Sequence, residues 1–195
     1  MRKSNYLLWI AGLVAGATSL SATTVIPPSF DQLVNQAEQI FRGTVTKVTS
    51  DWIGEGAERH IVSFITFKVK DSIKGSPGDS YTIRTFGGTV DGETMAIADG
   101  PVFHVGDEDF LFVENNGTQV VPLVGIMYGR FHVRKDNTGQ ESITTNEDRP
   151  LRDVAALDRP GTESASAPVL SPAAFKAAIQ AKLQGGQSDS NQSRN

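Results

Sequence analysis

Apolar and polar residues alternate with a period of two along most of the chain between residues 40 and 144. The longest such stretch covers residues 60–73, where the apolar residues share one face that only Ser63 and Asp71 interrupt. This alternation is typical of β-strands. The strands predicted in this way cover residues 40–48, 60–73, 81–85, 94–98, 110–113, 119–123, 128–133 and 142–144.

Glycine and proline turns separate these predicted strands and indicate the fold class. Gly54-Glu55-Gly56 follows the first strand, residues 74–79 contain Gly and Pro, and Asn116-Gly117 is a strong hairpin signal. Several short strands at close spacing, joined by such turns, are typical of a sandwich or a small barrel. We therefore predict that residues 23–145 form an all-β domain, a small barrel flanked by helices.

A short helix is expected before the first strand. Ser29 is a typical N-cap residue, and Gln32 stands where it completes a capping box. Apolar residues recur at helical spacing from Phe30 to Ala37. Because this helix is short, its stability should come from packing against the rest of the domain.

The composition changes after about residue 146. Residues 146–170 are predicted to be a linker, rich in Ser, Ala and Pro towards its end. A helix is predicted over residues 171–184, with a stripe of apolar residues that includes Phe175. Gly185-Gly186 should end this helix, and residues 185–195 are predicted to be a disordered tail.

Residues 1–22 have the three parts of a secretory signal peptide. A basic start precedes the apolar, uncharged residues 6–17, and small residues lead to Ala22. A membrane-spanning helix needs about 20 apolar residues, and this apolar run ends at Thr18. We expect cleavage after Ala22 and a secreted or periplasmic protein without a stable membrane anchor.

Composition and charge exclude several kinds of partner and chemistry. The chain carries 18 basic and 22 acidic residues, a net charge of −4, and loss of Arg2 and Lys3 with the signal makes it −6. Binding to nucleic acid or to anionic lipid requires clustered basic side chains, so neither is expected. The chain has no cysteine, which excludes disulfides, thiol catalysis and cysteine-based metal sites.

The remaining candidate ligands do not form a metal motif. His60, His104 and His132 belong to separate predicted elements and have no His-x-x-x-His or His-Glu-x-x-His spacing. The acidic run Asp107-Glu108-Asp109 lacks the alternating ligands of a calcium loop, so we interpret it as a solvated turn. No metal site and no cofactor are predicted.

No motif identifies catalytic residues either. The chain has no Gly-x-Ser-x-Gly nucleophile elbow, and residues 87–92 lack the Lys-Ser/Thr ending of a phosphate-binding loop, which favours a hairpin there. Catalytic residues can also come together from distant positions in the sequence. A hydrolase with a dispersed active site therefore stays an alternative, and no catalytic residue is assigned.

Three segments resemble the netrin-like family, to which the tissue inhibitors of metalloproteinases belong. They are residues 37–45 (AEQIFRGTV), 69–75 (VKDSIKG) and 103–112 (FHVGDEDFLF). The resemblance covers about residues 30–115 and implies an OB-type barrel with flanking helices. In addition, residues 122–131 (PLVGIMYGRF) are similar to a segment of exported bacterial proteins. These motifs are patterns of hydrophobic residues and glycine, so they inform the fold more than the activity.

The family resemblance implies regulation of a secreted protease, but one family feature is missing. Those inhibitors chelate the protease zinc through a mature N-terminal cysteine that disulfides hold in place. Here the expected mature end is Thr23, and a flexible Thr23 amine loses ordering entropy on binding. We predict a non-enzymatic binding or regulatory protein that acts on another exported protein. A hydrolase and a module for a small apolar or carbohydrate ligand are the alternatives.

Three aromatic residues are the candidate contacts for a partner or ligand: Trp52, Tyr128 and Phe131. Trp52 lies in a predicted loop, where barrels commonly bind, and tryptophan is enriched at binding hot spots. The alternative for Trp52 is a lid that folds back on the end of the barrel. An exposed apolar patch around Trp52 would favour partner binding, whereas histidines that meet carboxylates in a pocket would favour an enzyme.

Overall fold

The computed structural model describes residues 26–159, 164 and 166–192, with side chains up to Gly186. The predicted signal segment 1–22 and Thr23 lie outside the described residues. The described chain is mostly β-sheet with one α-helix before the strands and one after them, which confirms the predicted all-β fold with flanking helices. Neither of these two helices has both the length and the apolar character that spanning a bilayer requires.

Six strands form one antiparallel sheet in the order β3-β2-β1-β6-β7-β8. They are β1 (Gln39–Ile53), β2 (His60–Lys74), β3 (Ser80–Phe86), β6 (Glu108–Val113), β7 (Arg130–Lys135) and β8 (Glu141–Thr145). β4 (Gly88–Val90) and β5 (Glu93–Met95) form a separate hairpin, as predicted around residues 87–92. β3 and β8 are the outer strands of the main sheet and do not pair with each other, so strand pairing does not close this sheet into a barrel.

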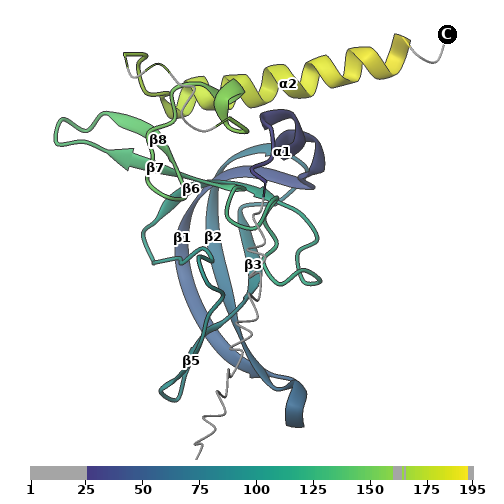
Figure 1. Cartoon of the computed structure of the whole chain (residues 1–195), viewed down its shortest axis with the longest axis vertical. Helices are drawn as coiled ribbons and strands as arrows, with labels where there is room; N and C mark the ends of the chain where they lie inside the picture. Colours follow the sequence, from purple (N-terminus) through teal and green to yellow (C-terminus); the bar gives the residue numbers. More distant parts are fainter. Residues whose placement is uncertain (1–25, 160–163, 165, 193–195) are drawn as a thin grey trace, which may run out of the picture.

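β1 and β2 form a long hairpin that bends out of the plane of the other strands. Up to Thr44, β1 pairs with β6 on one side and β2 on the other, and beyond it β1 pairs with β2 alone in the main sheet. The β1–β2 register shifts at three places, the last between Val45 and Lys47. Such irregularities increase the local twist of a strand. The far half of the hairpin therefore curves away from β6, β7 and β8 (Figure 1).

The segment after β6 covers the outer edge of β3. A strand is predicted over residues 119–123, but there only Leu123 forms a β-bridge, to Val113. The rest of this segment folds into turns, and its Val120 carbonyl accepts a hydrogen bond from the N–H of Phe86 on β3. The predicted strand is wrong because only its end pairs with β6, where the Glu114 N–H donates to the Pro122 carbonyl, while Val120 binds the edge of β3 instead.

The N-terminal helix α1 (Phe30–Gln36) begins as predicted. The Gln32 N–H donates to the Ser29 hydroxyl, and the Ser29 N–H donates to the Gln32 side-chain oxygen, so the capping box is confirmed. Leu33 and Val34 are buried against the sheet. Packing therefore stabilises this two-turn helix, in agreement with the prediction.

The C-terminal helix α2 (Pro172–Gln192) lies across the sheet next to α1 (Figure 1). Its buried residues Phe175 and Ile179 face the sheet. The predicted helix end at residue 184 is wrong, because α2 continues through Gly185-Gly186. Neither glycine takes the positive φ that commonly ends a helix. The predicted disordered tail is therefore also wrong for its described part, up to Gln192.

The described part of residues 146–170 is not a free linker, contrary to the prediction. Leu151 is fully buried, and its N–H donates to the Ile143 carbonyl on β8. The Ile143 N–H in turn donates to the carbonyl of Leu170, and the Leu170 N–H donates to that of Leu151. These bonds fix the segment along the outer edge of β8, which the composition of residues 163–168 does not reveal.

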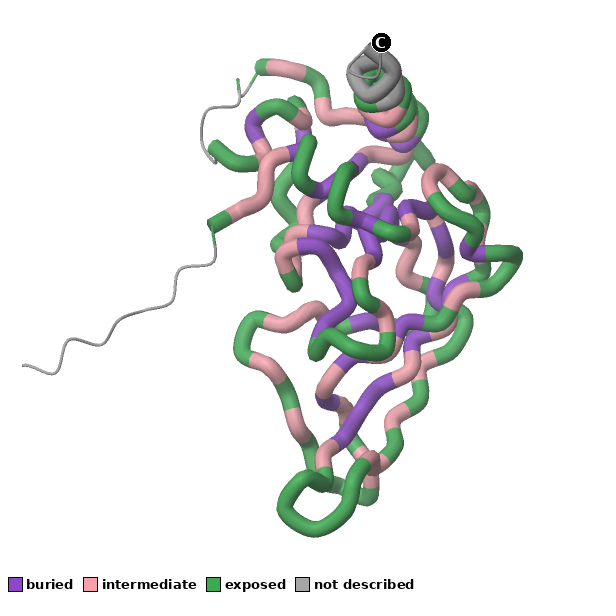
Figure 2. Tube along the Cα trace, turned by 90° about the vertical axis from the view of Figure 1, so that its right-hand side faces the viewer, coloured by how far each residue is buried: buried purple, intermediate pink, exposed green. Residues whose placement is uncertain are grey.

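Both faces of the sheet are covered, so the described chain has two hydrophobic cores. α1 and α2 cover one face, and this helix-side core consists of Phe30, Leu33, Val34, Ala37, Ile40, Phe110, Phe112, Val124, Phe131, Val133, Ile143, Leu151, Phe175 and Ile179. Loops cover the opposite face, and this loop-side core consists of Phe41, Val45, Ile65, Phe67, Ile83, Phe103, Leu111, Val113, Val121 and Leu123. Successive residues of β6 alternate between the two cores, as strand geometry requires. The buried segments run through the middle of the molecule (Figure 2).

Candidate functional site

A cavity of about 340 Å³ opens between the curved part of the sheet and the β4–β5 hairpin. Its lining residues come from β1, β2 and β3, from the hairpin, from residues 96–103 and from Val121 in the segment after β6. This volume falls within the range of small-molecule sites, roughly 300–1,000 Å³. We call it the hairpin cavity and take it as the candidate site.

Three hydroxyl groups form a row across the sheet at one end of the hairpin cavity. The strand register pairs Ser50 on β1 with Ser63 on β2, and Ser63 with Thr85 on β3. The two serine Oγ atoms are 2.8 Å apart, and the Ser63 hydroxyl donates to the Gly87 carbonyl at 2.6 Å. We call Ser50, Ser63 and Thr85 the hydroxyl row.

The next position along the same face of the sheet is apolar. Val48 on β1 pairs with Ile65 on β2, two residues from the serine pair, and both side chains line the hairpin cavity. Ile97, Phe103 and Val121 add apolar surface from the loops. The cavity is therefore polar at the hydroxyl row and apolar beside it.

Gly88 allows the β4–β5 hairpin to approach the hydroxyl row. A Cβ atom at this position would lie 2.3 Å from Ser50 Oγ and 2.4 Å from Ser63 Oγ, which is too close for nonbonded atoms. Its φ of 137° also favours glycine. The neighbouring Gly87 N–H donates to the Ile61 carbonyl on β2 and fixes the start of the hairpin. The hairpin thus forms one wall of the cavity.

The lining of the hairpin cavity carries no ionisable side chain. Among the described residues that form it, the polar groups are the hydroxyls of serine and threonine and the groups of the backbone. General acid–base catalysis relies on titratable side chains close to the substrate. The groups that this lining offers to a ligand are hydroxyl and backbone hydrogen-bond partners and apolar surface.

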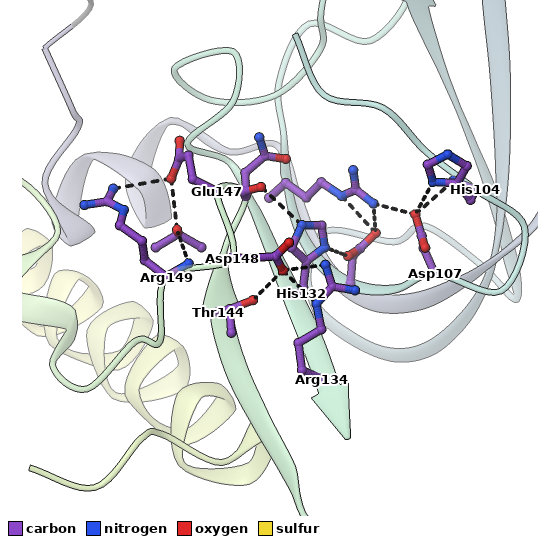
Figure 3. Close-up of polar contacts among 12 residues, drawn as sticks. His104, Asp107, His132, Arg134, Thr144, Glu147, Asp148 and Arg149 are labelled. Carbon is purple, nitrogen blue, oxygen red and sulfur yellow. Dashed lines mark hydrogen bonds and ion pairs between the residues drawn. The ribbon is translucent and has the colours of Figure 1, made fainter. Parts of the chain in front are cut away.

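A network of buried charges lies on the same face of the sheet, beyond this cavity. Arg130 Nε on β7 donates to Asp109 Oδ2 on β6 at 3.0 Å, and His132 Nδ1 lies 2.7 Å from Asp109 Oδ1 (Figure 3). The Asp109 side chain is fully buried, and those of Arg130 and His132 are nearly so. We call Asp109, Arg130 and His132 the buried charge network. Burial of ions is costly unless they are paired and hydrogen-bonded, as they are here.

The second nitrogen of His132 is also occupied. Its Nε2 lies 3.4 Å from the carbonyl oxygen of Asn146, so both ring nitrogens face acceptors inside the protein. His132 does not line the hairpin cavity. The Asp109–His132 pair therefore lacks the access to a substrate that a catalytic base needs.

The buried charge network holds another wall of the cavity. Arg130 Nη1 donates to the Val102 carbonyl at 2.5 Å, and the guanidinium carbon lies 4.0 Å from the centre of the Phe103 ring. This distance fits a cation–π contact. Val102 and Phe103 both line the hairpin cavity. The network is thus a structural support for the candidate site.

Asp107 extends this support towards the surface. Its carboxylate accepts from Arg130 Nη2 at 2.8 Å and from the backbone N–H of His104 at 2.9 Å (Figure 3). Burial alone would raise the pKa of the Asp107 carboxyl, but the His104 N–H and the Arg130 guanidinium together lower this pKa. Asp107 therefore stays ionised and paired with Arg130 at neutral pH.

Comparison with models of known protein families finds no match. Comparison with curated proteins finds no match either. The resemblance of residues 30–115 to the netrin-like family therefore stays a prediction, and the function is argued from the hairpin cavity and from the contacts around it.

The three predicted binding residues do not form one site: Tyr128 and Phe131 both line a cavity of only about 20 Å³, and Trp52 lies apart from them. Trp52 is not in the predicted loop but on β1, which runs to Ile53; it is half-buried there, and the Arg59 guanidinium carbon lies 4.1 Å from the centre of its ring. Tyr128 is half-buried and packs against the helix-side core. Phe131 is 1% exposed and contacts Phe112 and Phe175, so it is part of the helix-side core, the alternative to a binding role for these aromatic residues. The strand alternation places Phe131 under the helices.

The histidines do not meet at one site. His60 stacks on Phe86 with ring centres 5.7 Å apart, while the exposed His104 lies 3.7 Å from Asp107. His132 belongs to the buried charge network. Within the part of the chain that the structure describes, no three His, Asp or Glu side chains are placed to hold a metal ion.

The acidic run at residues 107–109 is not the solvated turn expected from the sequence. Its two aspartates bind Arg130 on the loop-side face, while Glu108 pairs with Arg42 and Lys70 on the other face, at 2.5 and 2.6 Å. The run leads into β6, so successive carboxylates point to opposite faces. The feature of the sequence that indicated a strand at this run is the predicted apolar strand, residues 110–113, which directly follows it.

Proposed function

We propose that the protein is an exported, non-enzymatic binding protein that takes a small ligand in the hairpin cavity. The observation that carries this proposal is a cavity of about 340 Å³ with convergent hydroxyl groups and no ionisable side chain in its lining. An apolar cavity with a few convergent polar groups is the common form of a ligand site. This is the small-ligand alternative among the functions considered from the sequence.

The buried charge network supports binding over hydrolysis. A hydrolase that used His132 would need one ring nitrogen within reach of its substrate or of a nucleophile. Here the two nitrogens of His132 face Asp109 and Asn146. Export is proposed from the sequence of residues 1–22, which has the composition of a secretory signal.

Filling the hairpin cavity tests the proposed function. We expect Ala96→Trp to weaken binding of prodan, an uncharged fluorescent naphthalene ketone, at least about tenfold, because the indole occupies the volume that the ligand needs. Ala96 lines the cavity and is exposed, so the change does not disturb either hydrophobic core. The measurement is a fluorescence titration of the purified protein.

The matched control is Ala57→Trp, at an exposed alanine near the end of the β1–β2 hairpin, which should bind prodan like the wild type. Circular dichroism shows whether both variants are folded. Equal affinities of the wild type and Ala96→Trp, or the absence of saturable binding, contradict the proposed function.

Regulation of an exported protease is the second candidate function. The β1–β2 hairpin projects from the body of the molecule and carries the Trp52–Arg59 pair near its end (Figure 1). Tryptophan and arginine are the residues most enriched at interaction hot spots. This surface and the family resemblance are the observations that favour a protein partner.

The Trp52→Ala variant tests this second candidate. In a pull-down from the exported fraction, it should recover less than about a tenth of the protease that the wild type recovers, because truncation of a hot-spot residue costs 2 kcal/mol or more. Lys47→Ala is the control, since Lys47 is exposed on the same strand. Equal recovery with Trp52→Ala and the wild type would remove this hairpin from the hypothesis.

A further inference from the structure

We propose that the hairpin cavity selects an uncharged alcohol: a molecule with an apolar body and a hydroxyl group that the hydroxyl row binds. This inference rests on the proposed function and specifies its ligand. Ser50, Ser63 and Thr85 bind the hydroxyl of the ligand, and the apolar residues beside them contact its body.

The hydrogen bonds within the hydroxyl row leave one donor and at least one acceptor for a ligand. Ser63 donates its proton to the Gly87 carbonyl, so in the contact between the two serines Ser50 is the donor. The Ser50 oxygen keeps a lone pair that can accept. Thr85 is 6% exposed, lines the cavity, and its hydroxyl has no hydrogen-bond partner among the described residues. A ligand hydroxyl can accept from Thr85, and Ser50 offers a second acceptor at the other end of the row, with β2 between the two positions.

The apolar side of the cavity fits the rest of such a ligand. Val48 and Ile65 lie two residues along their strands from Ser50 and Ser63. Ile97 and Phe103 line the same cavity from the loop segment, residues 96–103. Burial of methylene groups against these side chains is favourable because it removes apolar surface from water. The body of the ligand is thus aliphatic or otherwise apolar.

The electrostatics of the cavity select against charged head groups. A carboxylate or an ammonium group would lose its hydration there without meeting an opposite charge. Arg130, the cation that supports the cavity wall, is already engaged by Asp109, by Asp107 and by the Val102 carbonyl, and its guanidinium packs on the Phe103 ring. Uncharged ligands are therefore favoured over ions of the same size.

Three compounds with the same alkyl chain test this selection: 1-octanol, octanoate and octylammonium. Each is titrated against the prodan complex of the wild-type protein at neutral pH. We expect 1-octanol to displace prodan at a concentration at least about tenfold lower than either ion, because only the ions must lose a charged hydration shell.

Removal of the free hydroxyl gives a second readout. Thr85→Val keeps the shape of the side chain, and we expect it to weaken 1-octanol binding about tenfold while leaving octanoate unchanged. Thr82→Val on the opposite face of β3 is the matched control, since Thr82 is exposed. Ser50→Ala provides an independent variant of the row if Thr85→Val does not fold.

The outcomes separate this inference from the proposed function. If octanoate or octylammonium displaces prodan as well as 1-octanol does, or if neither Thr85→Val nor Ser50→Ala weakens 1-octanol binding, the choice of an alcohol is wrong while the cavity stays a ligand site. If the wild type and the Ala96→Trp variant bind prodan with equal affinity, the proposed function fails and this inference fails with it.

Discussion

Replacing Asp109 by alanine should lower the free energy of unfolding by about 3–5 kcal/mol, the cost of breaking a buried ion pair by removing one partner. Asp109 is the carboxylate that both Arg130 and His132 contact. Without it, the Arg130 guanidinium keeps Asp107, but His132 Nδ1 loses its partner inside the protein. Urea unfolding of the variant and the wild type, followed by circular dichroism, measures the difference.

An exposed ion pair on neighbouring elements provides the control for this prediction. Arg134 Nη2 lies 2.5 Å from Asp148 Oδ1, but the two side chains are 46% and 61% exposed. Arg134→Ala should therefore change the unfolding free energy by less than about 1 kcal/mol. A similar loss for Asp109→Ala and Arg134→Ala would mean that burial does not set the strength of the network.

Phe175→Ala should destabilise the protein by about 3–5 kcal/mol, the usual cost of truncating a buried phenylalanine. Phe175 is fully buried in the centre of the helix-side core. Its ring contacts four others, Phe30, Phe110, Phe112 and Phe131. The variant leaves a cavity between α2 and the sheet that these rings cannot fill without moving. Urea unfolding again gives the magnitude.

Gln180→Ala on the exposed side of α2 is the matched control for Phe175→Ala. Alanine has the higher helix propensity, so this change should be neutral or slightly stabilising. If Phe175→Ala unfolds at the same urea concentration as the wild type, α2 is not part of the cooperative structure, and the docking of α2 on the helix-side core would have to be revised.

Local patterns in the sequence were sufficient for the elements whose stability is local. The capping box at Ser29 and Gln32 forms within one helical turn, and it is confirmed. The alternation over residues 60–73 correctly predicts β2. The sequence also showed that Ser63 interrupts the apolar face of this strand. Only the strand register places Ser50 on β1 and Thr85 on β3 beside Ser63 and so reveals the hydroxyl row.

Long-range partners account for what the sequence did not reveal. Asp109 looks like part of a polar turn because its partners Arg130 and His132 are 21 and 23 residues away in the sequence. Phe131 was a candidate contact for a partner or ligand, and its burial was not evident because the helix that covers it lies beyond residue 170. In both cases the burial depends on which strands become neighbours, and hydrophobic periodicity does not determine that order.

The coverage of the two outer strands has a consequence for how molecules of this protein meet one another. On β3 the N–H of Phe86 is bound by Val120, and on β8 the N–H of Ile143 is bound by Leu170. Unoccupied strand edges are templates onto which other chains add, a frequent start of aggregation. Because segments of the same chain already occupy these positions, intermolecular strand addition at either side of the main sheet first requires that a covering segment detach.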